Sequence, residues 1–152
     1  MYIIHNINNI NIKDIYFGDS IKNTVLINGK FTRLLYSTSL YILNTLLLQI
    51  KMTDLSIENI YNKYKCIYSV DKNMQYIKKI EYLEKKILEK IVSKKKRVYN
   101  IKNQLYSGCI KLFTNSPIQQ NKTEMVLKIS GVWETYDEIG ITYKFMIVNE
   151  IL

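Results

Sequence analysis

The residues of this sequence that could do chemistry together are basic side chains interleaved with aromatic rings. Lys30, Phe31 and Arg33 stand close together, and Tyr36 and Tyr41 follow. Cations neutralise phosphates, and an exposed ring that stacks on a base contributes about 1–3 kcal/mol in proteins that bind single strands. We therefore predict nucleic-acid binding through the following side chains: Lys30, Phe31, Arg33, Tyr36, Tyr41, Lys94, Lys95, Lys96, Arg97, Lys128 and Lys144.

Residues 72–97 carry most of the net charge. They hold ten Lys or Arg against three Glu, in a chain whose formal net charge is +9. Apolar residues recur every three or four positions from Ile77 to Ile91, which predicts an amphipathic helix with one face in a core. Two interpretations of its basic face stay open, a solvated surface and a direct contact with phosphates. Residues 94–97, at the end of this helix, are the better contact.

Catalytic and metal-binding patterns are missing from the sequence. His5 is the single histidine, and Cys66 and Cys109 have neither CxxC nor Cys/His spacing, so the usual zinc sites and nucleophilic dyads are not expected. Acidic residues such as Asp137 and Glu138 fall in expected turns rather than in one cluster. We expect no enzymatic activity, no cofactor and no metal, and we expect both thiols to be reduced.

Length and composition fit one domain of 152 residues. No run approaches the roughly 18–20 apolar residues that a membrane span requires. The first residues lack the charged and apolar regions of a secretory signal. We therefore expect an intracellular protein without a membrane attachment. Ile, Lys, Asn and Tyr are abundant and alanine is absent, a usage that an AT-rich genome explains.

Short apolar segments between polar turns predict a mainly β chain. Principal strands are expected over residues 24–36, 41–52, 64–70, 108–114, 126–134 and 141–148, with a long helix over about 72–95. One or two short strands are expected within the first 20 residues, a helical turn over 55–62 and a short helix over 100–106.

Alternation is clearest in residues 126–148, which we expect to form a hairpin. Trp133, Tyr143 and Phe145 occupy odd positions, as do the apolar residues Leu127 and Ile129. Since odd positions of one strand share a face, we expect these three rings to lie in the core.

The order of elements predicts an OB-like fold, in the α+β class and mainly β. An OB fold is a Greek-key barrel that binds oligonucleotides through a strand face and flanking loops. We expect an antiparallel barrel of about five or six strands, with the long basic amphipathic helix between the third and fourth principal strands. The helix of such a barrel usually lies away from the ligand groove. The strands are therefore the expected binding surface.

Two segments resemble parts of small proteins of nucleocytoplasmic large DNA viruses. They are KFTRLLYSTSLYILN, residues 30–44, and LKISGVWETYDEIGITYKF, residues 127–145. Some proteins of these viruses are OB-fold single-stranded-DNA-binding proteins. The resemblance implies the same role here, with single-stranded DNA as the partner, in the viral factory of the host cytoplasm or in the nucleus.

A function of a different class stays open beside nucleic-acid binding. The chain could be a virion component or a subunit of a viral assembly that acts through protein–protein contacts. It would dock a viral partner, or a second copy of itself, through the long helix or an open sheet edge. A stable oligomer without affinity for nucleic acid would favour this alternative.

Overall fold

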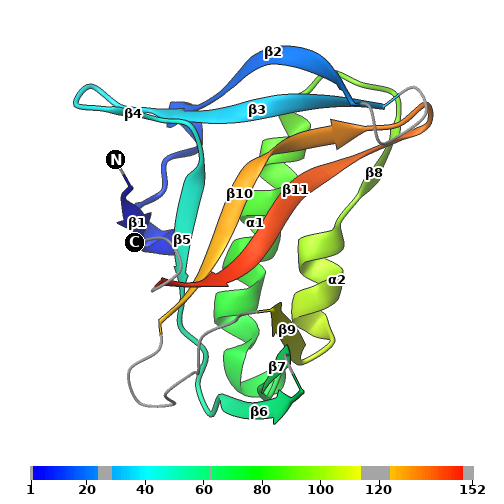
Figure 1. The fold of residues 1–152 in the computed structure, drawn as a ribbon. Helices are drawn as coiled ribbons and strands as arrows, with labels where there is room; N and C mark the ends of the chain where they lie inside the picture. Colours follow the sequence, from blue (N-terminus) through cyan, green and yellow to red (C-terminus); the bar gives the residue numbers. More distant parts are fainter. Residues whose placement is uncertain (1, 24–28, 62, 114–123, 149–152) are drawn as a thin grey trace.

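The chain is mostly β-structure in a computed structural model that describes residues 2–23, 29–61, 63–113 and 124–148 (Figure 1). The larger sheet contains β1 (Ile4–His5), β2 (Ile15–Asn23), β3 (Gly29–Ser37), β4 (Ile42–Leu43), β5 (Leu46–Ile50), β8 (Lys96–Val98), β10 (Met125–Glu134) and β11 (Glu138–Ile147). The smaller sheet contains β6 (Ser56–Ile60), β7 (Lys63–Ile67) and β9 (Cys109–Phe113). The helices are α1 (Met74–Glu89) and α2 (Asn100–Tyr106), with 3₁₀ turns at Ile7–Asn9, Ile12–Asp14 and Asp71–Asn73.

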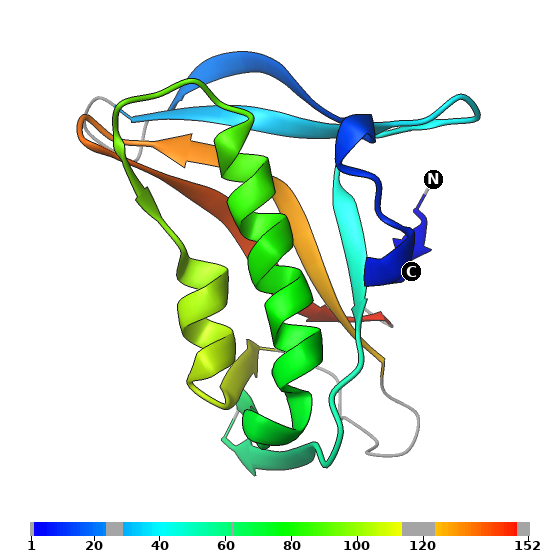
Figure 2. The ribbon, with the colours of Figure 1, turned by 180° about the vertical axis from the view of Figure 1, so that it is seen from behind.

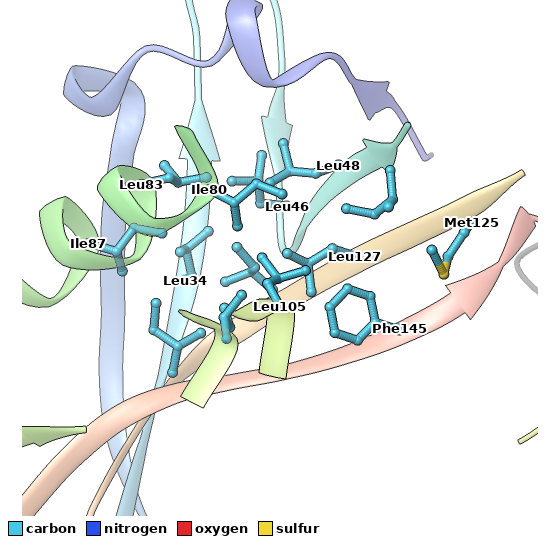
Figure 3. Packing of buried hydrophobic residues seen from close by; sticks show 14 of the residues in the cluster. Leu34, Leu46, Leu48, Ile80, Leu83, Ile87, Leu105, Met125, Leu127 and Phe145 are labelled. Carbon is cyan, nitrogen blue, oxygen red and sulfur yellow. The ribbon is translucent and has the colours of Figure 1, made fainter. Parts of the chain in front are cut away.

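The larger sheet curls in front of the helices. Figure 1 shows β10 and β11 in front of α1, and Figure 2, seen from behind, shows both helices on the near side. Apolar side chains from the sheet and the helices fill the space between them. In Figure 3, Leu34, Leu46 and Leu127 of the sheet lie against Ile80 and Ile87 of α1. Removal of this apolar surface from water is the main force that holds helices and sheet together.

Strand β10 is the centre of the larger sheet and changes partner along its length. One edge pairs with β11, whereas the other pairs first with β5 and then with β3. A β-bulge lies between Ile129 and Gly131, at the point where β5 gives way to β3. A bulge inserts one residue, so it reverses the alternation of side chains beyond it. Leu127 and Val132 therefore face the helices, while Gly131 and Trp133 face the opposite side.

The prediction that Trp133 lies in the core is wrong because of this bulge. Trp133 pairs with Gly140, whereas Leu127 pairs with Phe145 on the other face of β11. Phe145 is buried in the core, as predicted, and Tyr143 packs against it with only partial burial.

Some of the other predicted elements are confirmed by the structure, and some are wrong. The hairpin prediction is confirmed by β10 and β11, and the helix over 100–106 by α2. The helical turn over 55–62 is wrong, because these residues contain β6, which pairs with β7. The strand predicted over 41–52 is broken into β4 and β5, and predicted residues 24–28 and 114 lie outside the described part of the chain.

Helix α1 has the predicted apolar stripe but is shorter than predicted. It ends at Glu89, and residues 90–95 leave the helix before β8. Its buried residues are Ile77, Ile80, Leu83, Glu84, Ile87 and Leu88. None of the helices in the described residues is long and apolar enough to cross a membrane.

The carboxylate of Glu84 attaches α2 to α1. Glu84 is buried, and its Oε2 accepts the backbone N–H of Ile101 at 2.9 Å, while Oε1 accepts that of Lys102 at 2.9 Å. These N–H groups lie in the first turn of α2, where they have no partner within the helix. Burial raises the pKa of Glu84, and the two backbone hydrogen bonds oppose that rise.

Replacement of Glu84 by alanine should destabilise the fold. Two backbone donors would lose their acceptor, one of them in a buried residue, so we expect a loss of about 2–3 kcal/mol in the free energy of unfolding. Urea unfolding of Glu84→Ala measures the loss. Glu89→Ala is the matched control, because Glu89 is exposed on the same helix; equal stability of the two variants would contradict this role of Glu84.

His5 lies in an aromatic cluster beside the core. Its Nε2 is 3.3 Å from the hydroxyl of Tyr41, and its ring meets the ring of Tyr36 edge-on with 5.1 Å between centroids. The Tyr36 hydroxyl accepts the backbone N–H of Asn11 at 3.2 Å. Burial lowers the pKa of His5, because the charged imidazolium loses its hydration there.

Stability should therefore fall as the pH falls below about 6.5, the ordinary pKa of histidine. In that range the unfolded chain takes up a proton at His5 that the folded chain resists, so protonation favours unfolding. Thermal unfolding of the wild type and His5→Gln between pH 7.5 and 5.5 tests this. His5 is the single histidine, so the variant should lose the slope, and parallel profiles would refute the prediction.

Candidate nucleic-acid interface

The candidate interface is the face of the larger sheet that points away from the helices, at the front of Figure 1. Cross-strand pairing places its residues in rows. Phe31 pairs with Trp133, and Trp133 with Gly140; in the next row Arg33 pairs with Gly131. Beyond the bulge, Lys128 pairs with Lys144. We call this surface the outer face and define it by Phe31, Arg33, Lys128, Trp133 and Lys144.

Two aromatic rings of the outer face rest on glycines of the neighbouring strands. A Cβ atom at Gly131 would lie 2.8 Å from Cζ of Phe31, and one at Gly140 would lie 2.5 Å from Cζ2 of Trp133. Only a residue without a side chain allows a ring to lie so close to the backbone. Phe31 and Trp133 are half-buried and outside the core cluster. Each ring is therefore supported on one side and remains partly open to solvent.

Three cations accompany the rings. The guanidinium carbon of Arg33 lies 5.9 Å from the centroid of the Phe31 ring. Lys128 and Lys144 stand directly opposite each other on β10 and β11, an arrangement of like charges that is unfavourable in a sheet. Among the described residues, none of these three cations forms an ion pair with a carboxylate. A bound polyanion would relieve the repulsion between the two lysines.

Lys30, the neighbour of Phe31 in sequence, points to the other face and is paired. The carboxylate of Glu134 is almost fully buried and lies 3.3 Å from Nζ of Lys30 and 3.5 Å from Nζ of Lys95. Two of the predicted contacts therefore balance one buried negative charge, and their release would leave that charge unpaired.

The two predicted tyrosines lie in the cluster around His5. Tyr36 is 2% exposed, so its ring has no surface on which a base could stack. Tyr41 is half-buried, with its hydroxyl beside the His5 ring. Neither tyrosine lies on the outer face.

Residues 94–97 follow α1 and differ in whether their side chains have partners or are exposed. Arg97 binds the end of the helix: its guanidinium donates to the carbonyl oxygens of Ile91 at 3.0 Å and of Leu88 and Ser93 at 3.4 Å. Such a cation stabilises a helix C-terminus. Lys94 and Lys96 are exposed. Of these four residues, only the two exposed lysines remain candidate contacts.

The lysines in the middle of α1 do not reach the outer face, because the sheet lies between. Lys78, Lys79 and Lys85 are exposed on the helix, and Lys86 pairs with Glu89 at 3.2 Å. Of the two interpretations of the basic helix, this geometry favours the solvated surface.

Trp133 is the outer-face residue that the predicted site omitted. Its orientation depends on the bulge, and the sequence signal for that bulge is the pair Ser130 and Gly131 inside an apolar strand. A glycine within a strand often marks a bulge or a close approach of the backbone.

No group of three or more His, Cys, Asp or Glu side chains suited to a metal occurs in the described ranges.

Substitution of Gly140 by alanine should displace the Trp133 ring. The new Cβ would overlap Cζ2, so the indole must move away from the sheet. Trp133 is the single tryptophan, and we expect its fluorescence emission to shift to longer wavelength. Gly18→Ala is the control, because its Cβ would meet neighbours only at 3.8 Å or more. An unchanged emission spectrum in Gly140→Ala would show that the ring does not rest on Gly140.

The outer face thus joins two supported aromatic rings with three cations that have no carboxylate partner among the described residues. No protein-family model, curated protein or solved structure matches the chain.

Proposed function

We propose that this chain binds single-stranded nucleic acid on its outer face and catalyses no reaction. The observation that carries the proposal is the combination of Phe31 and Trp133 with Arg33, Lys128 and Lys144 on adjacent strands of one face. Rings that bases can stack on, beside cations that follow the phosphates, are the two components of a site for single strands. DNA is the form that the resemblance to viral single-stranded-DNA-binding proteins implies.

Each contact in such a site contributes a modest binding free energy, and several contacts together can hold a single strand. Each ring that stacks on a base contributes about 1–3 kcal/mol. Each phosphate that a cation neutralises adds about −0.7 to the slope of the logarithm of the binding constant against the logarithm of salt concentration, so three cations give about −2. Backbone contacts and stacking are both tolerant of sequence, so little sequence preference is expected along the face.

An OB-like barrel is the fold that we propose for this binding role. Curling of the sheet, the exchange of β5 for β3 along β10, and a helix on the side opposite the outer face all support it. Two features depart from an antiparallel barrel. β1 pairs with β5 in parallel, and so does β8 with β11.

A structural or assembly role is the second candidate, and the smaller sheet favours it. β6 lies at an edge of that sheet; its last residue, Ile60, is 47% exposed, and Tyr61 in the turn after it is 95% exposed. An edge strand with exposed apolar side chains can pair with another chain. Light scattering distinguishes the candidates, because an oligomer without affinity for oligonucleotides would favour assembly.

Titration of a fluorescent oligonucleotide with wild type, Lys144→Ala and Lys85→Ala tests the proposed function. Both variants remove one exposed lysine and change the net charge equally, but only Lys144 lies on the outer face. We expect Lys144→Ala to weaken binding at low salt and to reduce the salt slope by about 0.7, because one phosphate contact is lost. Lys85→Ala should bind as the wild type does.

Two results would contradict the proposal. Absence of binding at low salt would exclude the function itself. Equal loss in the two lysine variants would show that binding follows net charge and not the outer face.

A further inference from the structure

A pocket opens on the outer face at the end remote from Trp133. It is lined by Leu47 and Lys128, which pair across β5 and β10. The other lining residues come from the segment before β1, from β4 and from the corner between β4 and β5. The volume is about 320 Å³, and the lining residues are Tyr2, Ile3, Ile42, Leu43, Asn44, Thr45, Leu47 and Lys128.

The lining exposes both kinds of surface, with more polar than apolar area. Leu43 and Leu47 are buried beneath the pocket, while the side chains of Asn44, Thr45 and Lys128 offer an amide, a hydroxyl and an ammonium group. The volume is at the lower end of the range for small-ligand sites, and the lining is more polar than is usual for them. A single nucleobase matches the pocket in size, and the polar edge of the base can hydrogen-bond to these polar side chains.

The position of the pocket connects it with the row of cations. Lys128 lines the pocket and also stands opposite Lys144. Trp133 lies five positions further along β10, about 16 Å away at about 3.3 Å per residue. A strand that stacks on Trp133 and follows the cations would therefore bring its next bases to the mouth of the pocket.

We propose that this pocket receives one unstacked base of the bound strand, an inference that rests on the function proposed above. Bases of a duplex are paired and stacked, and their extrusion costs a few kcal/mol. The pocket therefore selects single strands over duplexes. It also provides base contacts at one position, whereas the cations contact only phosphates.

Crosslinking locates the base directly. A single-stranded oligonucleotide that carries 4-thiothymine at one position is bound, irradiated and analysed by mass spectrometry of the protein fragments. We expect crosslinks to residues 42–45 or to Tyr2, from at least one position of the modified base. An oligonucleotide that binds but crosslinks only elsewhere, for example at Trp133, would overturn the pocket and leave the proposed function standing. Absence of binding would remove both.

A pair of variants tests the chemistry of the same contact. Asn44→Ala removes a pocket amide, and we expect affinity for the oligonucleotide to fall by up to about tenfold with an unchanged salt slope, because a base contact releases no counterion. Asn103→Ala is the matched control, since Asn103 is exposed on α2, away from the outer face. Wild-type affinity in Asn44→Ala, or a reduced salt slope, would overturn the proposed base contact.

Discussion

The β-bulge between Ile129 and Gly131 is the constraint on which the sheet and its outer face depend. Before the bulge, β10 pairs with β5 and directs Leu127 and Ile129 toward α1; after it, β10 pairs with β3 and directs Val132 the same way. If the same residues formed a regular strand without the bulge, Trp133 would share the core face of Leu127 and Ile129, and Val132 would lie on the opposite face. One local irregularity thus places Val132 in the core and the aromatic ring of Trp133 on the outer face.

Two buried carboxylates have structural partners, and one of them holds two lysines of this lysine-rich chain. Glu134 is paired with Lys30 and Lys95, while Glu84 binds the backbone of α2. A buried carboxylate requires such partners, because its desolvation is otherwise unfavourable. The lysines held in this way are part of the structure. The cations of the outer face have no such carboxylate among the described residues and remain available to a ligand.

The helices and the outer face have separate roles in the proposed function. α1 buries its apolar stripe against the sheet, and Lys78, Lys79 and Lys85 of this helix are exposed. In the proposed function, the high charge of residues 72–97 contributes to the long-range field that attracts a polyanion, and the strands make the direct contact. As proposed, the pocket beside Lys128 would add to this face a base contact that cations alone do not provide.

Local patterns in the sequence determined the mainly β composition, the hairpin of β10 and β11, the short helix α2 and the buried stripe of α1, because each depends on the periodicity of neighbouring residues. Tertiary structure alone decided which candidate contacts share a surface. Tyr36 is buried because β3 presents it to the core, and Lys30 is paired because Glu134 lies across from it. β6 is a strand because β7 pairs with it. Trp133 faces outward because the bulge reverses the alternation of side chains along β10. Pairing between distant segments and compensation of buried charge act across the fold, so no local window of the sequence contains them.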